Sequence, residues 1–151
     1  KYIAFHRPNN SGFGKASIWY AESPDLIHWG KYKCLARPRK TSYEAGKIGG
    51  GCAPIKTEKG WLTIYHAKGG DSQYTLFGML LDLNEPSKII KQTDKPILEP
   101  VEGYEKNGFF GNTVFTNGMV EKDGKLYIYY GAADDSCCVA MTTVEHILNL
   151  F

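Results

Sequence analysis

Three tyrosine-rich segments recur along the chain at an interval of about 60 residues. They cover residues 1–8, 61–68 and 125–132, and the last two follow a charged turn that ends in glycine. Each segment is rich in Tyr, Ile and Leu, which is typical of a strand that leaves a hairpin turn. A repeat of this length built from antiparallel strands favours the blades of a propeller, although it is longer than the usual propeller repeat.

A second strand-like stretch follows each of these segments, at residues 16–21, 74–81 and 138–143. A short polar turn then leads to a further short strand, which ends near Leu35 in the first unit and near Ile97 and Leu98 in the second. The only helical signal is a turn at residues 144–148. The sequence therefore predicts an all-β fold, with a sandwich or an open sheet as the competing arrangement of the same strands.

About two and a half repeat units are present, whereas a propeller closes with at least four blades. We therefore expect residues 1–151 to be the C-terminal portion of a single β-propeller domain whose N-terminal blades lie outside the chain. Consistent with strands and tight turns, 13% of the residues are aromatic and 17 are glycines.

Composition and charge exclude several classes of protein. The formal net charge of +2 is too small for a typical nucleic-acid binder, and no apolar run is long enough to span a bilayer. The four cysteines form no Cys-x-x-Cys pair, which predicts mostly buried free thiols and no metal site. Together with the absence of a signal peptide at the start, they predict a cytoplasmic protein.

Common catalytic motifs are missing: there is no Gly-x-Ser-x-Gly, no His-Glu-x-x-His and no phosphate-binding loop ending in Gly-Lys-Ser/Thr. The glycine-rich residues 46–51 taken alone would be a flexible turn. The aspartates show no pairing that their spacing can establish.

Several segments in order resemble glycoside hydrolase family 130. The matching residues are 5–8, 23–29, 46–55, 60–66, 74–76, 80–83, 85–88, 96–100, 112–118 and 129–134. The family comprises β-mannoside phosphorylases and a smaller set of β-mannosidases on a five-bladed propeller. The resemblance implies phosphorolysis of a β-mannoside with inversion, which gives α-mannose 1-phosphate. It implies no cofactor, with inorganic phosphate as the co-substrate.

The resemblance also assigns candidate site residues. The phosphate-binding positions are Arg7, Lys47, His66 and Tyr74, and a phosphate anion needs such a cationic, hydrogen-bonding surround. The substrate-binding positions are Asp134, which would hold hydroxyls of the reacting sugar, together with Asn112 and Phe115. No residue matches the general acid of the family, so the catalytic residue is unassigned and the chain alone is not expected to turn over.

Each candidate has a purely structural alternative: an exposed lysine, a hydrogen-bonded histidine, core aromatics, or turn aspartates. The functional alternatives are a β-mannoside hydrolase of the same family, a non-catalytic carbohydrate-binding propeller, and a scaffold for a protein partner. The predicted partners are a β-mannoside oligosaccharide and phosphate, and neither nucleic acid nor a membrane is expected. The sequence leaves open whether the protein forms a homo-oligomer.

Overall fold

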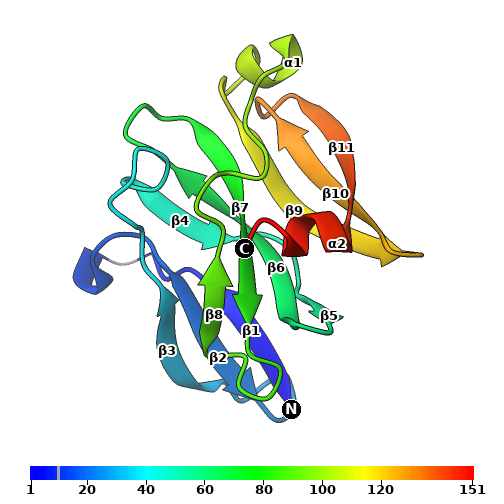
Figure 1. The fold of residues 1–151 in the computed structure, drawn as a ribbon. Helices are drawn as coiled ribbons and strands as arrows, with labels where there is room; N and C mark the ends of the chain where they lie inside the picture. The colour runs from blue at the N-terminus through cyan, green and yellow to red at the C-terminus, as the bar shows by residue number, and fades with distance from the viewer. Residues whose placement is uncertain (10) are drawn as a thin grey trace.

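The computed structural model describes residues 1–9 and 11–151, and it is built from three antiparallel sheets (Figure 1). The first sheet has the order β1-β2-β3, the second β4-β6-β7-β8 with β5 paired to β6, and the third β11-β10-β9. Their bounds are β1 Tyr2–His6, β2 Ile18–Ser23, β3 Gly30–Ala36, β4 Lys47–Gly50, β5 Ile55–Thr57, β6 Gly60–Lys68, β7 Tyr74–Leu81, β8 Ile89–Gln92, β9 Val114–Lys122, β10 Lys125–Ala132 and β11 Ser136–Thr143.

The predicted all-β fold is confirmed, and the repeated segments become the corresponding strands β1, β6 and β10 of the three sheets. The short strand predicted after the second polar turn is present as β8, but its predicted end near Ile97 and Leu98 was wrong, because β8 ends at Gln92 and Leu98 makes only an isolated bridge to Leu76. The glycine-rich stretch is not a flexible turn but contains β4, which pairs with β6.

The described residues also form three short helical segments: η1 Ser11–Phe13, α1 Gly103–Lys106 and α2 Val144–Leu148. The predicted helical turn at residues 144–148 is thus confirmed as α2. The Thr143 side chain caps α2 by accepting a hydrogen bond from the His146 backbone N–H at 3.0 Å. Ile147 of α2 is buried in the core beside the third sheet.

The second sheet is covered on both faces, and this explains its sequence. Successive side chains of a strand point to opposite faces, so Leu62 and Ile64 of β6 join the core shared with the third sheet. Tyr65 of β6 joins the other core, which is shared with the first sheet and includes Phe77 and Ile48. By contrast, the burial of β11 alternates along its length, and Met141 on its outer face is 70% exposed.

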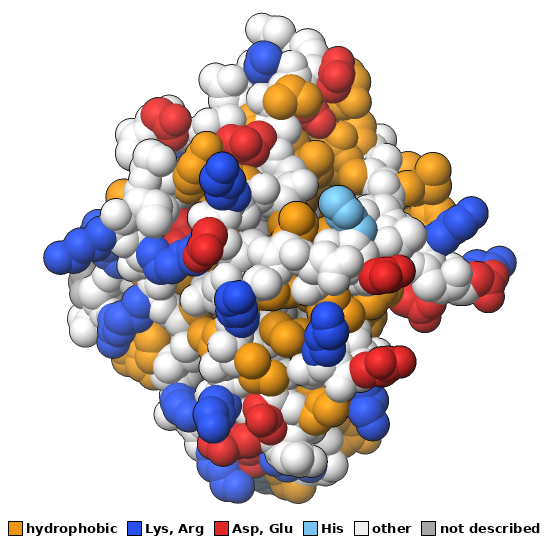
Figure 2. Space-filling model, viewed as in Figure 1, with side chains coloured by type: hydrophobic (Ala, Val, Ile, Leu, Met, Phe, Trp, Pro, Cys, Tyr) orange, Lys and Arg blue, Asp and Glu red, His pale blue; other side chains and the backbone are white. Residues whose placement is uncertain are grey.

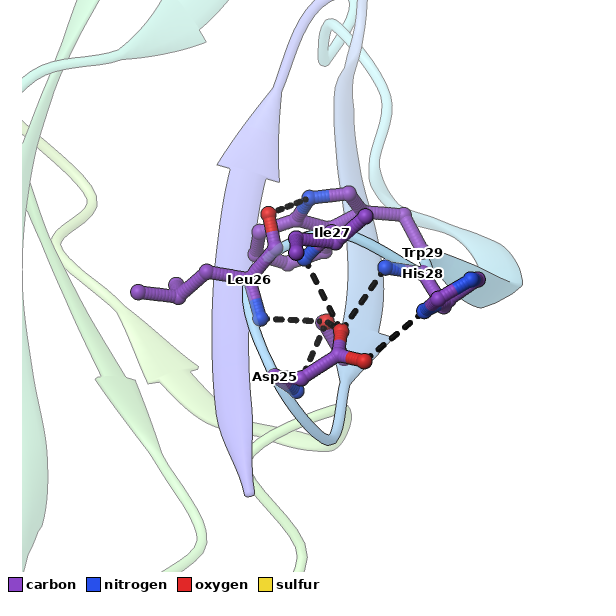
Figure 3. Close-up of polar contacts among 6 residues, drawn as sticks. Asp25, Leu26, Ile27, His28 and Trp29 are labelled. Carbon is purple, nitrogen blue, oxygen red and sulfur yellow. Dashed lines mark hydrogen bonds and ion pairs between the residues drawn. The ribbon is translucent and has the colours of Figure 1, made fainter.

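A polar turn closes the β2–β3 hairpin of the first sheet (Figure 3). The Asp25 carboxylate accepts hydrogen bonds from the backbone N–H groups of Ile27 and His28, at 2.9 and 2.8 Å, and lies 2.7 Å from the His28 ring nitrogen Nδ1. These contacts hold the pKa of Asp25 low, at about 2. Asp82 repeats this role after β7, where it accepts from the backbone of Asn84 and Glu85. These aspartates therefore shape turns in successive repeats.

The face in Figure 2 has basic and acidic side chains interspersed, with hydrophobic side chains between them. Within the described part of the chain, no helix has the length and apolar character needed to cross a membrane. All four cysteines are free thiols. Only Cys52 is buried, and Cys137 is exposed, so the expectation that the thiols are mostly buried was wrong.

Candidate functional site

One end of the second sheet gathers five of the predicted site residues. Antiparallel pairing sets Lys47 of β4 opposite Lys68 of β6, and Lys68 opposite Tyr74 of β7. Directly paired residues share a face, and His66 lies on the same face of β6 as Lys68 because it is two residues away. The register of three strands therefore places Lys47, His66 and Tyr74 together.

His66 is the centre of this cluster, with only 4% of its surface exposed. Its ring lies 4.0 Å from the Phe115 ring and 6.2 Å from the Tyr74 ring, measured between centroids. The Arg7 guanidinium lies 3.5 Å from Nε2 of His66. Because a guanidinium only donates, this contact requires Nε2 as the acceptor and leaves the proton on Nδ1. Nδ1 is buried and has no hydrogen-bond partner among the described residues.

A glycine makes the approach of Arg7 to His66 sterically feasible. Gly49 of β4 pairs directly with His66, and a Cβ atom at this position would lie 2.4 Å from Nε2 of His66. The same atom would lie 3.0 Å from the Arg7 guanidinium. The glycine-rich stretch therefore removes a side chain where an arginine and a histidine meet.

The cluster carries excess positive charge. Burial, and then the charges of Arg7 and Lys47, lower the pKa of His66 to about 4, so the ring is neutral at pH 7. The Lys47 ammonium lies 5.4 Å from the centre of the Tyr74 ring, a cation–π contact. Among the ion pairs of residues 1–9 and 11–151, none includes Arg7 or Lys47.

The remaining predicted residues are linked to this cluster through the backbone. The Asn112 carbonyl accepts a hydrogen bond from the Tyr74 N–H at 3.0 Å, and Asn112 has a left-handed φ of 55°. The Ala133 N–H donates to the Thr113 carbonyl at 2.9 Å. Asp134 follows Ala133 in an exposed turn and has a φ of 53°. The backbone of this turn, rather than a contact of the Asp134 side chain, connects Asp134 to the cluster.

A groove beside the cluster has a volume of about 490 Å³. Arg7, His66 and the backbone of Gly49 line one part of it, and apolar residues such as Phe5 and Ile18 line another. Among the described residues, no group of three or more His, Cys, Asp and Glu side chains is placed to hold a metal ion. The arrangement is suited chemically to an anion, because it offers unpaired cations and an unsatisfied histidine nitrogen.

Sequence reasoning did not identify Lys68 or Phe110, which also belong to this cluster. The Lys68 ammonium lies 5.6 Å from the Tyr74 ring centre and 5.5 Å from that of Phe110. The two-residue period of a strand, applied from His66, would have indicated Lys68.

Comparison with known proteins agrees with this picture. The sequence profile of glycoside hydrolase family 130, described as beta-1,4-mannooligosaccharide phosphorylase, matches residues 1–151. The chain therefore belongs to glycoside hydrolase family 130, a family of enzymes that includes mannoside phosphorylases, as the sequence predicted. Its propeller-type relatives confirm the expected partial propeller fold.

Among characterised relatives, the beta-1,2-mannobiose phosphorylase of Listeria innocua is 46% identical over 149 residues, 99% of this chain and 42% of that protein. The beta-1,4-mannooligosaccharide phosphorylase of Ruminococcus albus is 34% identical over 157 residues, 99% of this chain and 46% of that protein. The chain thus spans less than half the length of these relatives.

The solved structures show the same fold. The Listeria innocua enzyme in complex with beta-1,2-mannobiose superposes with a TM-score of 0.96 at 45% identity, over 99% of this chain and 42% of that one. A second structure comes from a description of the GH130 family of mannoside phosphorylases as containing glycoside hydrolases that target beta-1,2 mannosidic linkages in Candida mannan. It superposes with a TM-score of 0.77 at 27% identity, over 96% of this chain and 49% of that one.

Proposed function

We propose that this chain forms part of a glycoside phosphorylase that cleaves β-mannosides with inversion and releases α-mannose 1-phosphate. The observation that carries the proposal is the cluster of Arg7 and Lys47 around the neutral His66, in which no carboxylate of the described residues forms an ion pair with either cation. An inverting hydrolase places a water molecule opposite the leaving group and needs a base to activate it. Phosphate is already anionic, so it needs cations to hold it instead.

In the proposed reaction, a phosphate oxygen attacks the anomeric carbon of the mannoside. The glycosidic C–O bond breaks, and its oxygen takes a proton from a general acid. Arg7, Lys47 and Tyr74 would hold the phosphate, with the buried, neutral His66 ring beside Arg7. No contact of the described residues places a carboxylate against this cluster, so the proposal assigns no general acid within this chain.

The sugar would lie on the other side of the phosphate, next to the β10–β11 turn. Asp134 is exposed in this turn, and its neighbour Ala133 is hydrogen-bonded to the segment that carries Asn112 and Phe115. We assign to Asp134 the role of binding mannose hydroxyls. Phe115 supports the site because its ring packs against the His66 ring.

Product analysis tests the proposal. The whole protein that carries this chain is incubated with β-1,2-mannobiose or β-1,4-mannobiose, with and without inorganic phosphate, and mannose 1-phosphate and free mannose are quantified. The proposal predicts mannose 1-phosphate and strong dependence on phosphate. Release of free mannose at the same rate with and without phosphate would identify a hydrolase of the same family instead.

Lys47→Met separates the phosphate site from the sugar site. Removal of one charge-assisted contact costs about 1.5–3 kcal/mol, so the KM for phosphate is expected to rise about ten- to a hundredfold. Asp134→Ala is expected to lower kcat/KM for the mannoside, with a much smaller change in the KM for phosphate. Equal effects of both variants on both substrates would contradict this division of roles.

We also propose a reducing, cytoplasmic location. It is supported by the four free thiols, since disulfides are the usual state of paired cysteines in oxidising compartments. An export signal encoded by the gene and absent from the mature protein, as shown by N-terminal sequencing, would contradict it.

A further inference from the structure

Lys68 stands out because it lies directly opposite Lys47 across the β4–β6 pair. Like charges in directly opposed positions of a sheet repel each other and destabilise the pair. No ion pair formed by the described residues includes either lysine, and both side chains are half-buried. The fold therefore keeps two uncompensated ammonium groups on one face of the sheet.

Aromatic rings hold both ammonium groups in place. The Lys47 and Lys68 ammonium groups lie 5.4 and 5.6 Å from the centre of the same ring, that of Tyr74. Lys68 also lies 5.5 Å from the ring centre of Phe110, whose ring is 5.9 Å from that of Tyr74. Cation–π contacts of this kind fix the position of a cation without neutralising its charge.

Lys68 is also continuous with the phosphate cluster. It lies two residues after His66, on the same face of β6, and the His66 Nδ1 atom is buried without a partner. An anion at this end of the sheet would relieve the repulsion between the two lysines.

We propose that Lys68 is a second ammonium ligand of the phosphate, acting together with Lys47 from the adjacent strand. This inference rests on the proposed function for the identity of the anion. Two ammonium groups matched to one phosphate dianion would give the site its selectivity for the doubly charged form over singly charged anions.

Calorimetric titration of inorganic phosphate into the whole protein, without mannoside, tests the inference. Lys68→Met keeps most of the aliphatic length and removes the charge, and we expect phosphate binding about tenfold weaker, at the lower end of the range for a charged contact because Lys68 is half-exposed. Lys68→Arg keeps the charge and an arginine can also make the cation–π contacts, so this variant is expected to bind within about threefold of wild type. Lys91→Met is the matched control, since Lys91 is an exposed lysine of the same sheet on β8.

The outcomes separate this inference from the proposed function. If wild type binds phosphate but does not consume it with mannosides, the phosphorylase proposal fails, and the Lys68 variants still decide the inference. If Lys68→Met and Lys68→Gln both bind phosphate as tightly as wild type, the inference is wrong while the phosphorylase proposal stands. Weaker mannoside binding with unchanged phosphate binding also overturns it. A wild-type protein that does not bind phosphate overturns both.

Discussion

Tyr65 and His66 are neighbours on β6, yet they enter opposite layers of the molecule with opposite electrostatic surroundings. Tyr65 faces the first sheet, where its hydroxyl donates to the Glu44 carboxylate at 2.5 Å and accepts from the Gln92 amide at 2.9 Å. Glu44 is fully buried and also pairs with Arg39. The charges on this face compensate each other within the chain.

His66 lies in the opposite situation, because the nearest charges, those of Arg7 and Lys47, are both positive. Burial and the Glu44 carboxylate raise the pKa of Tyr65, whereas burial and two cations lower the pKa of His66. A buried polar group whose hydrogen-bonding partners are all present has a structural role. A buried polar group that lacks a partner and is surrounded by cations indicates a ligand site. The following predictions test this contrast, from the largest effect to the smallest.

Removal of Glu44 should produce the largest loss of stability. In Glu44→Ala, the Arg39 guanidinium loses its ion pair and the Tyr65 hydroxyl loses its acceptor in the core. Breaking a buried pair from one side destabilises strongly, and we expect the free energy of unfolding in urea to fall by about 3 kcal/mol. Glu58→Ala, at an exposed turn, is the control. A loss below about 1 kcal/mol would show that this face does not depend on its ion pair.

Acidification should destabilise the protein through His66. Its pKa is about 4 when folded and about 6.5 when unfolded, so between these values the unfolded state binds a proton that the folded state excludes. Stability is therefore fully present above pH 6.5 and falls as the pH drops toward 4, by about 2 kcal/mol between pH 7 and pH 5. Urea unfolding at both pH values measures this difference. A His66→Phe variant should show a much smaller one, and an unchanged difference would exclude His66 as its source.

A methyl group at Gly49 should disturb the His66 face alone. The added Cβ of Gly49→Ala would lie 2.4 Å from Nε2 of His66, so we expect a loss of about 1–2 kcal/mol and weaker phosphate binding. Gly118→Ala is the matched control, because a Cβ atom there meets no atom within 4 Å. Thermal melts and phosphate titrations of both variants are compared. Equal behaviour of the two would mean that the close approach of Arg7 to His66 is not needed.

Lys47→Met should change stability least. Lys47 makes no ion pair with a described residue, and its loss removes repulsion from Lys68, so we expect the free energy of unfolding to stay within about 0.5 kcal/mol of wild type. Only phosphate affinity should fall. A loss of stability comparable to that of Glu44→Ala would show that Lys47 has a structural role, as Glu44 does.

The sequence located the strands that carry the candidate site better than it located the supporting core. The repeat located β6 and β10, because long apolar segments with Tyr and Ile have a strong strand signal. The resemblance pointed to Lys47, His66 and Tyr74, which the strand register brings together. Their roles stay predictions, as do those of Asp134 and Asn112.

Other features depend on three-dimensional contacts that carry no local pattern. Glu44 was not identified, because it is an isolated carboxylate in a loop that becomes buried only when Arg39 and Tyr65 fold around it. Short β8 was misplaced, because its four residues give little periodicity. The requirement for glycine at position 49 follows from two side chains distant in sequence, that of His66 on β6 and that of Arg7, which follows β1.

The contrast between the compensated charges around Tyr65 and the uncompensated cations around His66 is tested most directly by titrating His66 itself. Nuclear magnetic resonance of the labelled histidine ring gives its pKa in the whole protein, with and without saturating phosphate. We predict a pKa of about 4 without phosphate and a clear upward shift, of about one unit or more, with phosphate, because a nearby anion favours the protonated ring. An identical pKa in both conditions would contradict the account, because phosphate would then not bind beside His66.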